Sequence, residues 1–108
     1  MDHPIAVLAG TPVDTQMGVD VLEGAGRHGL AFPLADNPWA QTAFQIASEQ
    51  EKRETVLSVL HKAQAQGCRQ VFVYCNSLSA SVDFPTLAAE TGLHIVTPLD
   101  VYRQLAAQ

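Results

Sequence analysis

One cysteine precedes a run of hydrogen-bonding residues that could support acid–base or nucleophilic chemistry. In residues 71–81, VFVYCNSLSAS, four apolar or aromatic residues lead into Cys75. These four suit a buried strand, whereas Asn76, Ser77 and Ser79 suit a turn or a helix cap. A helix start beside Cys75 would favour the thiolate, because the helix dipole stabilises negative charge. Such a thiolate can act as a base or a nucleophile, although a lone strand cysteine more often only packs.

The other cysteine and the histidines point to neither a disulfide nor a metal site. If residues 70–75 form a strand, Cys68 and Cys75 lie roughly 20 Å apart at about 3.3 Å per residue. A disulfide requires Cα atoms within about 7 Å, so the two cannot pair in one chain. The four histidines show no metal-ligand spacing with either cysteine; they are His3, His28, His61 and His94.

The composition is that of one domain spanning residues 1–108. Apolar residues make up 47% of the chain, enough for one core, and the net charge is −5. This charge leaves no basic surface for nucleic acid or anionic lipid. No apolar run approaches the length of a membrane span, and the first ten residues lack the basic region of an export signal. We therefore expect a cytoplasmic protein with no nucleic-acid or membrane partner.

Four short apolar runs alternate with helix-like segments. The runs are IAVLA (5–9), LAFPLA (30–35), VFVYC (71–75) and HIVTPL (94–99). Nearly continuous apolar strands separated by helices are typical of a parallel sheet that helices cover on both faces. The sequence therefore predicts an α/β fold.

The first helix is predicted from a start signal and an apolar stripe. Thr11, Pro12 and Asp14 have the form of a hydroxyl cap, a first-turn proline and a capping box. An apolar residue then recurs every fourth position, and we expect this stripe to face the sheet. The stripe comprises Val13, Met17, Val21 and Ala25, with Leu22 beside it, and Gly26 and Gly29 end the helix.

Further helices are predicted between the remaining strands. Ser48 with Glu51 starts a helix over about 48–66 that Gly67 stops. Residues 38–47 suggest a short helix. Another short helix is expected near Ser77, followed by one that restarts around Pro85 and ends at Gly92. A closing helix is expected from about Asp100.

This element order predicts a short doubly wound, flavodoxin-like three-layer sandwich with strands in the order 2-1-3-4. Ligands of such sheets bind beyond the carboxyl ends of the strands, where the winding reverses between the first and third strands. The loops there are residues 9–12, which contain Gly10 and Thr11, and residues 75–79. Asn37, with Asp36 and Trp39, would flank the same crevice. Because both loops lead into helix N-termini, a carboxylate or phosphate is the expected ligand.

Each of these residues also has a purely structural interpretation. Thr11 and Asp14 would cap a helix in any case, and Asn76 could satisfy turn backbone. Trp39 could equally cover the core. His94 starts the last strand, at the edge opposite the crevice, and is expected to be structural.

The segment GCRQVFVYCNSLSASVDFPTLAAETGLHIVTPLDVY resembles the stretch of aspartate/glutamate racemase superfamily proteins in which a strand ends in Cys-Asn-Thr. Here the triplet is Cys75-Asn76-Ser77. Upstream, IAVLAGTPVDTQMGVDVL is similar to the family's opening strand and glycine-rich turn, and LADNPW to its second strand and proline-aromatic loop. The resemblance covers nearly the whole chain in order, and it corresponds to the first of the family's two pseudo-symmetric halves.

The resemblance implies a cofactor-independent amino-acid racemase in which Cys75 is one of two opposed acid/base cysteines. Inversion at carbon requires deprotonation and reprotonation on opposite faces. Asn76, Ser77 and Ser79 would bind the substrate, as would Gly10 and Thr11 in the first loop, with Asn37 beside them. A homodimer with two-fold symmetry would supply the second cysteine from the other copy.

Two other classes of function stay open. A binding or sensing module would keep the fold and the anion-attracting pocket but hold a small carboxylate or amino acid without chemistry. A carrier with a redox-active or phosphorylated cysteine is weaker, because no Cys-x-x-Cys pair or phosphoacceptor loop lies near Cys75.

Overall fold

Four parallel strands form the central sheet in the order β2-β1-β3-β4. The strands are β1 (Ile5–Ala9), β2 (Gly29–Pro33), β3 (Gln70–Val73) and β4 (His94–Val96). The structure is a computed structural model, and it describes residues 3–35, 37–74, 78 and 82–97. The described helices are α1 (Pro12–Gly24), α2 (Pro38–Ile46), α3 (Glu49–Ala65) and α5 (Phe84–Thr91). The predicted fold class and strand order are confirmed.

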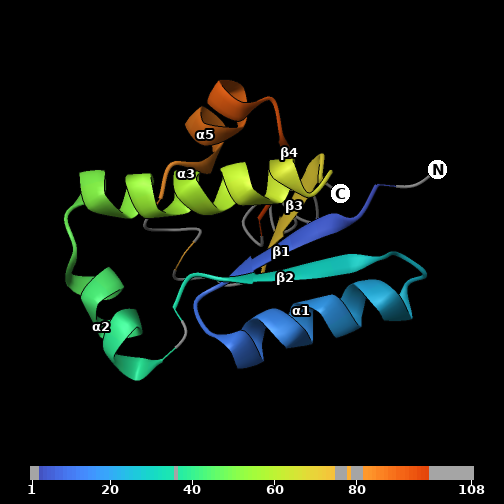
Figure 1. The fold of residues 1–108 in the computed structure, drawn as a ribbon, viewed down its shortest axis with the longest axis horizontal. Helices are drawn as coiled ribbons and strands as arrows, with labels where there is room; N and C mark the ends of the chain where they lie inside the picture. Colours follow the sequence, from blue (N-terminus) through green and yellow to red (C-terminus); the bar gives the residue numbers. More distant parts are fainter. Residues whose placement is uncertain (1–2, 36, 75–77, 79–81, 98–108) are drawn as a thin grey trace, which may run out of the picture.

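Helices lie on both faces of the sheet, which gives the three layers of the predicted sandwich. Figure 1 shows α1 on one face and α3 with α5 on the other. The central strand β1 pairs with β2 from Ile5↔Gly29 to Ala9↔Pro33 and with β3 from Ile5↔Gln70 to Leu8↔Val73. All five residues of β1 are buried because helices cover both of its faces.

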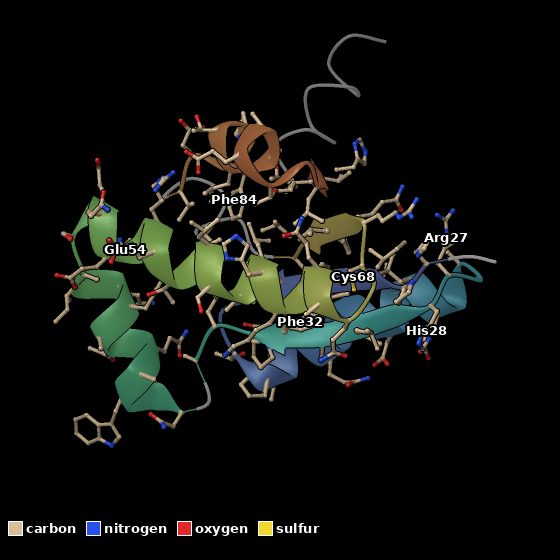
Figure 2. The ribbon with its side chains drawn as sticks, turned by 45° about the horizontal axis from the view of Figure 1, so that its top comes forward. Arg27, His28, Phe32, Glu54, Cys68 and Phe84 are labelled. Atoms are coloured by element: carbon tan, nitrogen blue, oxygen red, sulfur yellow. The ribbon has the colours of Figure 1, made fainter. Side chains whose placement is uncertain are left out.

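The larger core lies between the sheet and the α3/α5 layer. Alternate strand residues, such as Leu8 and Val71, point into this layer and meet Leu60 of α3 and Phe84 of α5. Figure 2 shows Phe84 directed from α5 toward α3 and the sheet. The two helices are further linked by an Arg53–Glu90 ion pair and by a hydrogen bond from Gln64 Nε2 to the Thr91 carbonyl oxygen at 2.8 Å.

Helix α1 begins as predicted but turns a different face to the sheet. Thr11 Oγ1 accepts the Asp14 N–H at 3.2 Å, which confirms the cap. The predicted stripe points outward, since Val13 is 71% exposed and Met17 and Val21 are about half exposed. The sheet-facing residues are instead Thr15, Gly18 and Val19.

The close approach of α1 to the sheet explains this difference. A Cβ built on Gly18 would lie 2.6 Å from Val7 Cγ1 and 3.1 Å from Tyr74 Cβ. Only a small residue fits there, so the face that carries Thr15 and Gly18 lets the helix axis come nearer to the strands. The larger side chains at four-residue spacing then point away from the sheet.

The other helix boundaries follow their sequence signals. Ser48 caps α3 by accepting the Glu51 N–H at 3.2 Å, and Asp83 caps α5 by accepting the Thr86 N–H at 3.3 Å. Gly92 ends α5 in the left-handed conformation, with φ of 76°, as its position predicted. The helices expected near Ser77 and from Asp100 lie outside the described residues. None of the described helices combines the length and the apolar character that a membrane crossing requires.

Candidate functional site

The β1–α1 turn carries Gly10 and Thr11 at the carboxyl edge of the central strand. The Thr11 side chain caps α1. The backbone carbonyl oxygen of Thr11 accepts hydrogen bonds from the Thr15 N–H at 3.0 Å and from the Thr15 hydroxyl at 2.5 Å. These bonds hold the turn against the first helical turn. The structural role predicted for Thr11 is therefore observed, and the hydroxyl group keeps its hydrogen as a donor.

Asn37 is brought to the same edge by the continuation of β2 beside the β1 loop. The Leu34 N–H donates to the Ala9 carbonyl oxygen at 2.9 Å, and the Ala35 N–H donates to that of Gly10 at 3.1 Å. Asn37 Oδ1 then accepts the Ala40 N–H at 2.8 Å and caps α2. This cap occupies the side-chain oxygen and leaves the amide NH₂ as the donor that Asn37 brings to the edge.

Gln41 is a residue of this edge that sequence analysis did not select. It is half-buried on α2, and its Nε2 atom lies 3.9 Å from the position that a Cβ on Gly10 would take. A glutamine in a helix carries no motif, and only the fold of α2 over the β1 turn brings it to Gly10. The recognisable signal was indirect: the Asn37 cap places the first turn of a helix, and hence position 41, beside the crevice.

The end of β3 lies directly beside β1 at this edge. The Tyr74 N–H donates to the Leu8 carbonyl oxygen at 2.9 Å, which extends the pairing of the two strands by one residue. The Tyr74 ring lies 5.6 Å from the Phe72 ring between centroids, and its Cβ approaches α1 at Gly18. The predicted residues Cys75, Asn76, Ser77 and Ser79 lie outside the described residues, so their roles stay predictions.

Two helix N-termini open at this edge. Figure 1 shows the starts of α1 and α2 at the same end of the molecule, where β1 and β2 finish. Helix α1 starts directly after Gly10 and Thr11, so the positive end of its dipole favours an anionic group such as a carboxylate at this turn. Asp14, in the first turn of α1, is an acidic side chain near this field. Other described side chains at this edge carry hydroxyl and amide groups, from Thr11, Asn37 and Gln41.

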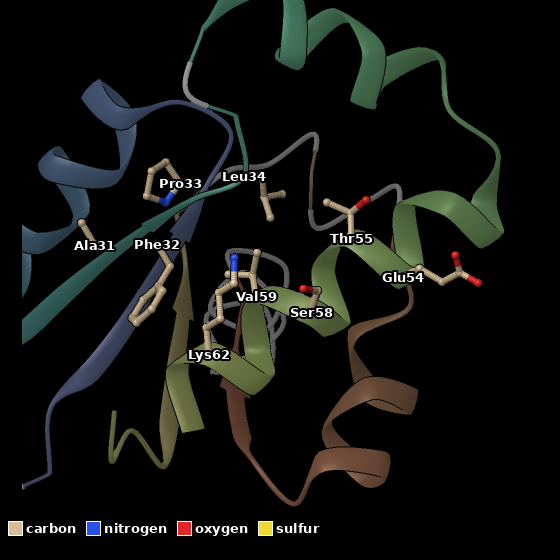
Figure 3. A pocket seen from close by; sticks show the side chains of 9 residues that line it. All are labelled: Ala31, Phe32, Pro33, Leu34, Glu54, Thr55, Ser58, Val59 and Lys62. Atoms are coloured by element: carbon tan, nitrogen blue, oxygen red, sulfur yellow. The ribbon is translucent and has the colours of Figure 1, made fainter. Parts of the chain in front are cut away.

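Two hollows that described residues line lie away from this edge. The larger one, about 600 Å³, lies between β2 and α3. Figure 3 shows Phe32 and Leu34 on its sheet side, with Glu54 and Lys62 on its helix side. It is widely open, because β2 is an edge strand that α3 only partly covers. Part of the lining of the predicted crevice, namely Cys75, Asn76, Ser77 and Ser79, lies outside the described residues.

Cys68 is at the opposite edge of the sheet from the candidate site. Figure 2 shows it beside the end of α3, on the same side of the molecule as Arg27 and His28, which precede β2. It is a free, buried thiol, and burial raises the pKa of this thiol. A buried neutral thiol is a poor nucleophile and a poor metal ligand. His94, at the start of β4, also lies at this edge, as expected.

The described part of the chain contains no cluster of side chains that could bind a metal ion. Within residues 3–35, 37–74, 78 and 82–97, no three His, Cys, Asp or Glu side chains come together as a metal ion would require.

Comparison with protein-family models, with curated proteins and with solved structures gave no match for this chain.

Proposed function

We propose that the chain is an aspartate/glutamate racemase-like protein that uses Cys75 to exchange the α-proton of an amino acid. The observation that carries the proposal is the pairing of β1 with β3 up to the Leu8–Tyr74 hydrogen bond. This pairing brings the Gly10–Thr11 turn to the same edge as Tyr74, the residue immediately before Cys75. In a doubly wound sheet, this edge at the reversal of winding is the usual ligand site.

The substrate carboxylate is proposed to bind in front of Gly10, at the start of α1. Backbone N–H groups and the helix dipole stabilise an anion there, and the Thr11 hydroxyl and Asn37 amide lie at the same edge. By resemblance, Asn76, Ser77 and Ser79 complete the contacts to the substrate. Such binding also favours the reaction, because a neutralised carboxylate accepts the electron pair of the α-carbanion more readily.

The second acid/base group is proposed to come from a homodimer. The Cys75 thiolate takes the α-proton from one face, and the electron pair that this leaves on carbon delocalises toward the carboxylate. The partner's Cys75 thiol then delivers its proton to the opposite face. The configuration at carbon inverts, and one thiol and one thiolate remain with their places exchanged, so no cofactor or oxidant is consumed.

A non-catalytic module that binds a small carboxylate or amino acid is the alternative. It is favoured by the side chains of Thr11, Asn37 and Gln41 at this edge, which are hydrogen-bonding hydroxyl and amide groups. These can hold a ligand, but none is a base suited to removing an α-proton. Under this alternative, Cys75 packs or contacts the ligand without transferring a proton.

The deciding experiment is proton exchange in D₂O, followed by NMR of the α-proton of aspartate, glutamate and other amino acids. We expect deuterium at the α-carbon with the wild-type protein and none with Cys75→Ala. Cys68→Ala is the matched control: it also removes a thiol, but from the opposite edge of the sheet, so it should retain exchange. Absence of exchange with every amino acid tested would contradict the catalytic proposal.

Thermal unfolding with added amino acids and dicarboxylates separates a binder from a protein without this site. A ligand present at 100 times its Kd stabilises the folded state by about 2.7 kcal/mol. A rise in Tm without α-proton exchange would support the binding module. Neither a Tm rise nor exchange with any small carboxylate would contradict both proposals.

A further inference from the structure

Helix α2 exposes an apolar face that nothing in the described chain covers. Trp39 is 86% exposed and Ile46 is 81% exposed, and Ala43 is also exposed. These residues follow the spacing i, i+4 and i+7, which puts them on one side of a helix. Trp39 is the only tryptophan of the chain. Figures 1 and 2 both place α2 at one end of the molecule, where β1 and β2 finish.

Few side chains of α2 pack inward. It has nine residues, and among those with described side chains only Gln41 and Phe44 are even half-buried. Isolated helices shorter than about 12–15 residues are marginal in water, and in proteins most helix stability comes from packing an apolar face. The face formed by Trp39, Ala43 and Ile46 is the one that further packing can use.

The charge distribution selects a second copy of this chain as the covering surface. The chain carries a net charge of −5, so two copies repel each other over most of their surfaces. Residues 37–48, NPWAQTAFQIAS, contain no charged side chain. A surface without charge and with exposed apolar side chains can meet its own copy without burying or opposing like charges.

We propose that α2 packs antiparallel against α2 of a second copy across a two-fold axis. In this arrangement Trp39 packs against the partner's Ile46, and the partner's Trp39 packs against Ile46. Ala43 lies near the axis, where its small side chain lets the two helices approach. A two-fold interface of this kind is self-complementary, because the same residues serve on both sides.

This inference deepens the proposed function, on which it rests for the requirement of a second copy. Asn37 caps α2, and Gln41 of α2 lies beside Gly10, so the interface borders the candidate site of each copy. One short helix face offers less than the roughly 800 Å² per partner of a standard interface. The dimer is therefore expected to be weak and concentration-dependent, with Trp39 as its main anchor.

Analytical ultracentrifugation over a range from about micromolar to millimolar protein tests the interface. We expect the wild-type protein to change from monomer to dimer, and Trp39 emission to shift to shorter wavelength as the indole leaves water. Ile46→Glu should remain monomeric, because it would place a charge against an apolar partner. The matched control Val21→Glu also adds a charge at an exposed apolar helix position and should dimerise like the wild type.

Cross-linking gives a second measurement that does not depend on weakening the fold. Ala43→Cys, in a chain with both native cysteines replaced by alanine, should form an intermolecular disulfide under mild oxidation, because the two copies of position 43 face each other. Val21→Cys in the same background should not form this disulfide.

The two proposals can fail separately. A dimer through α2 without α-proton exchange would support the interface and contradict the proposed catalysis. A wild-type protein that stays monomeric, or a dimer that Val21→Glu disrupts and Ile46→Glu does not, would overturn the α2 interface.

Discussion

Replacing Gly18 by alanine should destabilise the protein, although alanine is the better helix former. Gly18 lies in the middle of α1, where the helix crosses the end of β3. The added methyl would lie 2.6 Å from Val7 Cγ1 and 3.1–3.2 Å from Tyr74 Cβ and Cγ. Val7 is fully buried on the central strand, and its β-branched side chain has little freedom to move aside. Either α1 must shift outward or Tyr74 must move.

Two opposing effects determine the magnitude. An alanine in a helix interior is favoured over glycine by about 1 kcal/mol. Adding a methyl group to a tightly packed site costs typically about 1–3 kcal/mol, and a contact this short with a rigid neighbour belongs to the upper part of that range. We therefore expect the free energy of unfolding to fall by roughly 1–2 kcal/mol. Tm should fall by about 4–8 °C for each kcal/mol lost.

Gly24→Ala is the matched control on the same helix. A Cβ at Gly24 meets no atom within 4 Å, so this change should give part of the helix-forming gain and no packing cost. Urea unfolding followed by circular dichroism at the helix band measures both variants against the wild type. The packing argument would be refuted if Gly18→Ala unfolds at the same urea concentration as Gly24→Ala, with unchanged dependence on urea.

Two further predictions concern Cys68 and Thr11. Because burial raises the pKa of the Cys68 thiol, the unfolded chain loses this proton at lower pH than the folded chain. Ionisation of Cys68 should therefore leave the free energy of unfolding unchanged at neutral pH and lower it as the pH rises through and above the ordinary thiol pKa of about 8.5. Urea titrations from pH 7 to 10 should show a smaller decline in the free energy of unfolding for Cys68→Ala than for the wild type. Equal declines would contradict the prediction. Thr11→Ala should lose about 1 kcal/mol of stability with the α1 cap, whereas Thr11→Ser keeps the accepting oxygen and most of the stability. Thermal unfolding compares the two variants, and an equally large loss for serine would show that the hydroxyl cap is not the cause.

Local signals predicted the elements of the fold because their causes are local. The caps at Thr11 and Ser48 are satisfied by N–H groups three residues away, and Gly92 ends α5 through its own backbone conformation. The apolar runs became the four strands within a few residues. The strand order followed from general rules for parallel sheets, and its agreement with the structure places Gly10, Thr11 and Asn37 at one edge.

The orientation of α1 could not be predicted from apolar periodicity. Both faces of this helix have a helical pattern, one with Val13, Met17 and Val21 and the other with Thr15, Gly18 and Val19. Apolar periodicity in the sequence predicts that the face with the larger apolar residues is the buried one. In the folded protein, the smaller face is buried because it permits the closer approach to β1 and β3.

The sequence by itself determined where strands and helices begin and end, since propensity, capping and turn chemistry act over a few residues. It also placed Cys75 directly after an apolar strand, which is the basis of the proposed chemistry. Only the tertiary structure decided which face of α1 meets the sheet, that Gln41 lies beside Gly10, and that Trp39 and Ile46 face away from the core. These depend on how closely distant elements can approach one another, and that distance is set by pairs of side chains far apart in the sequence.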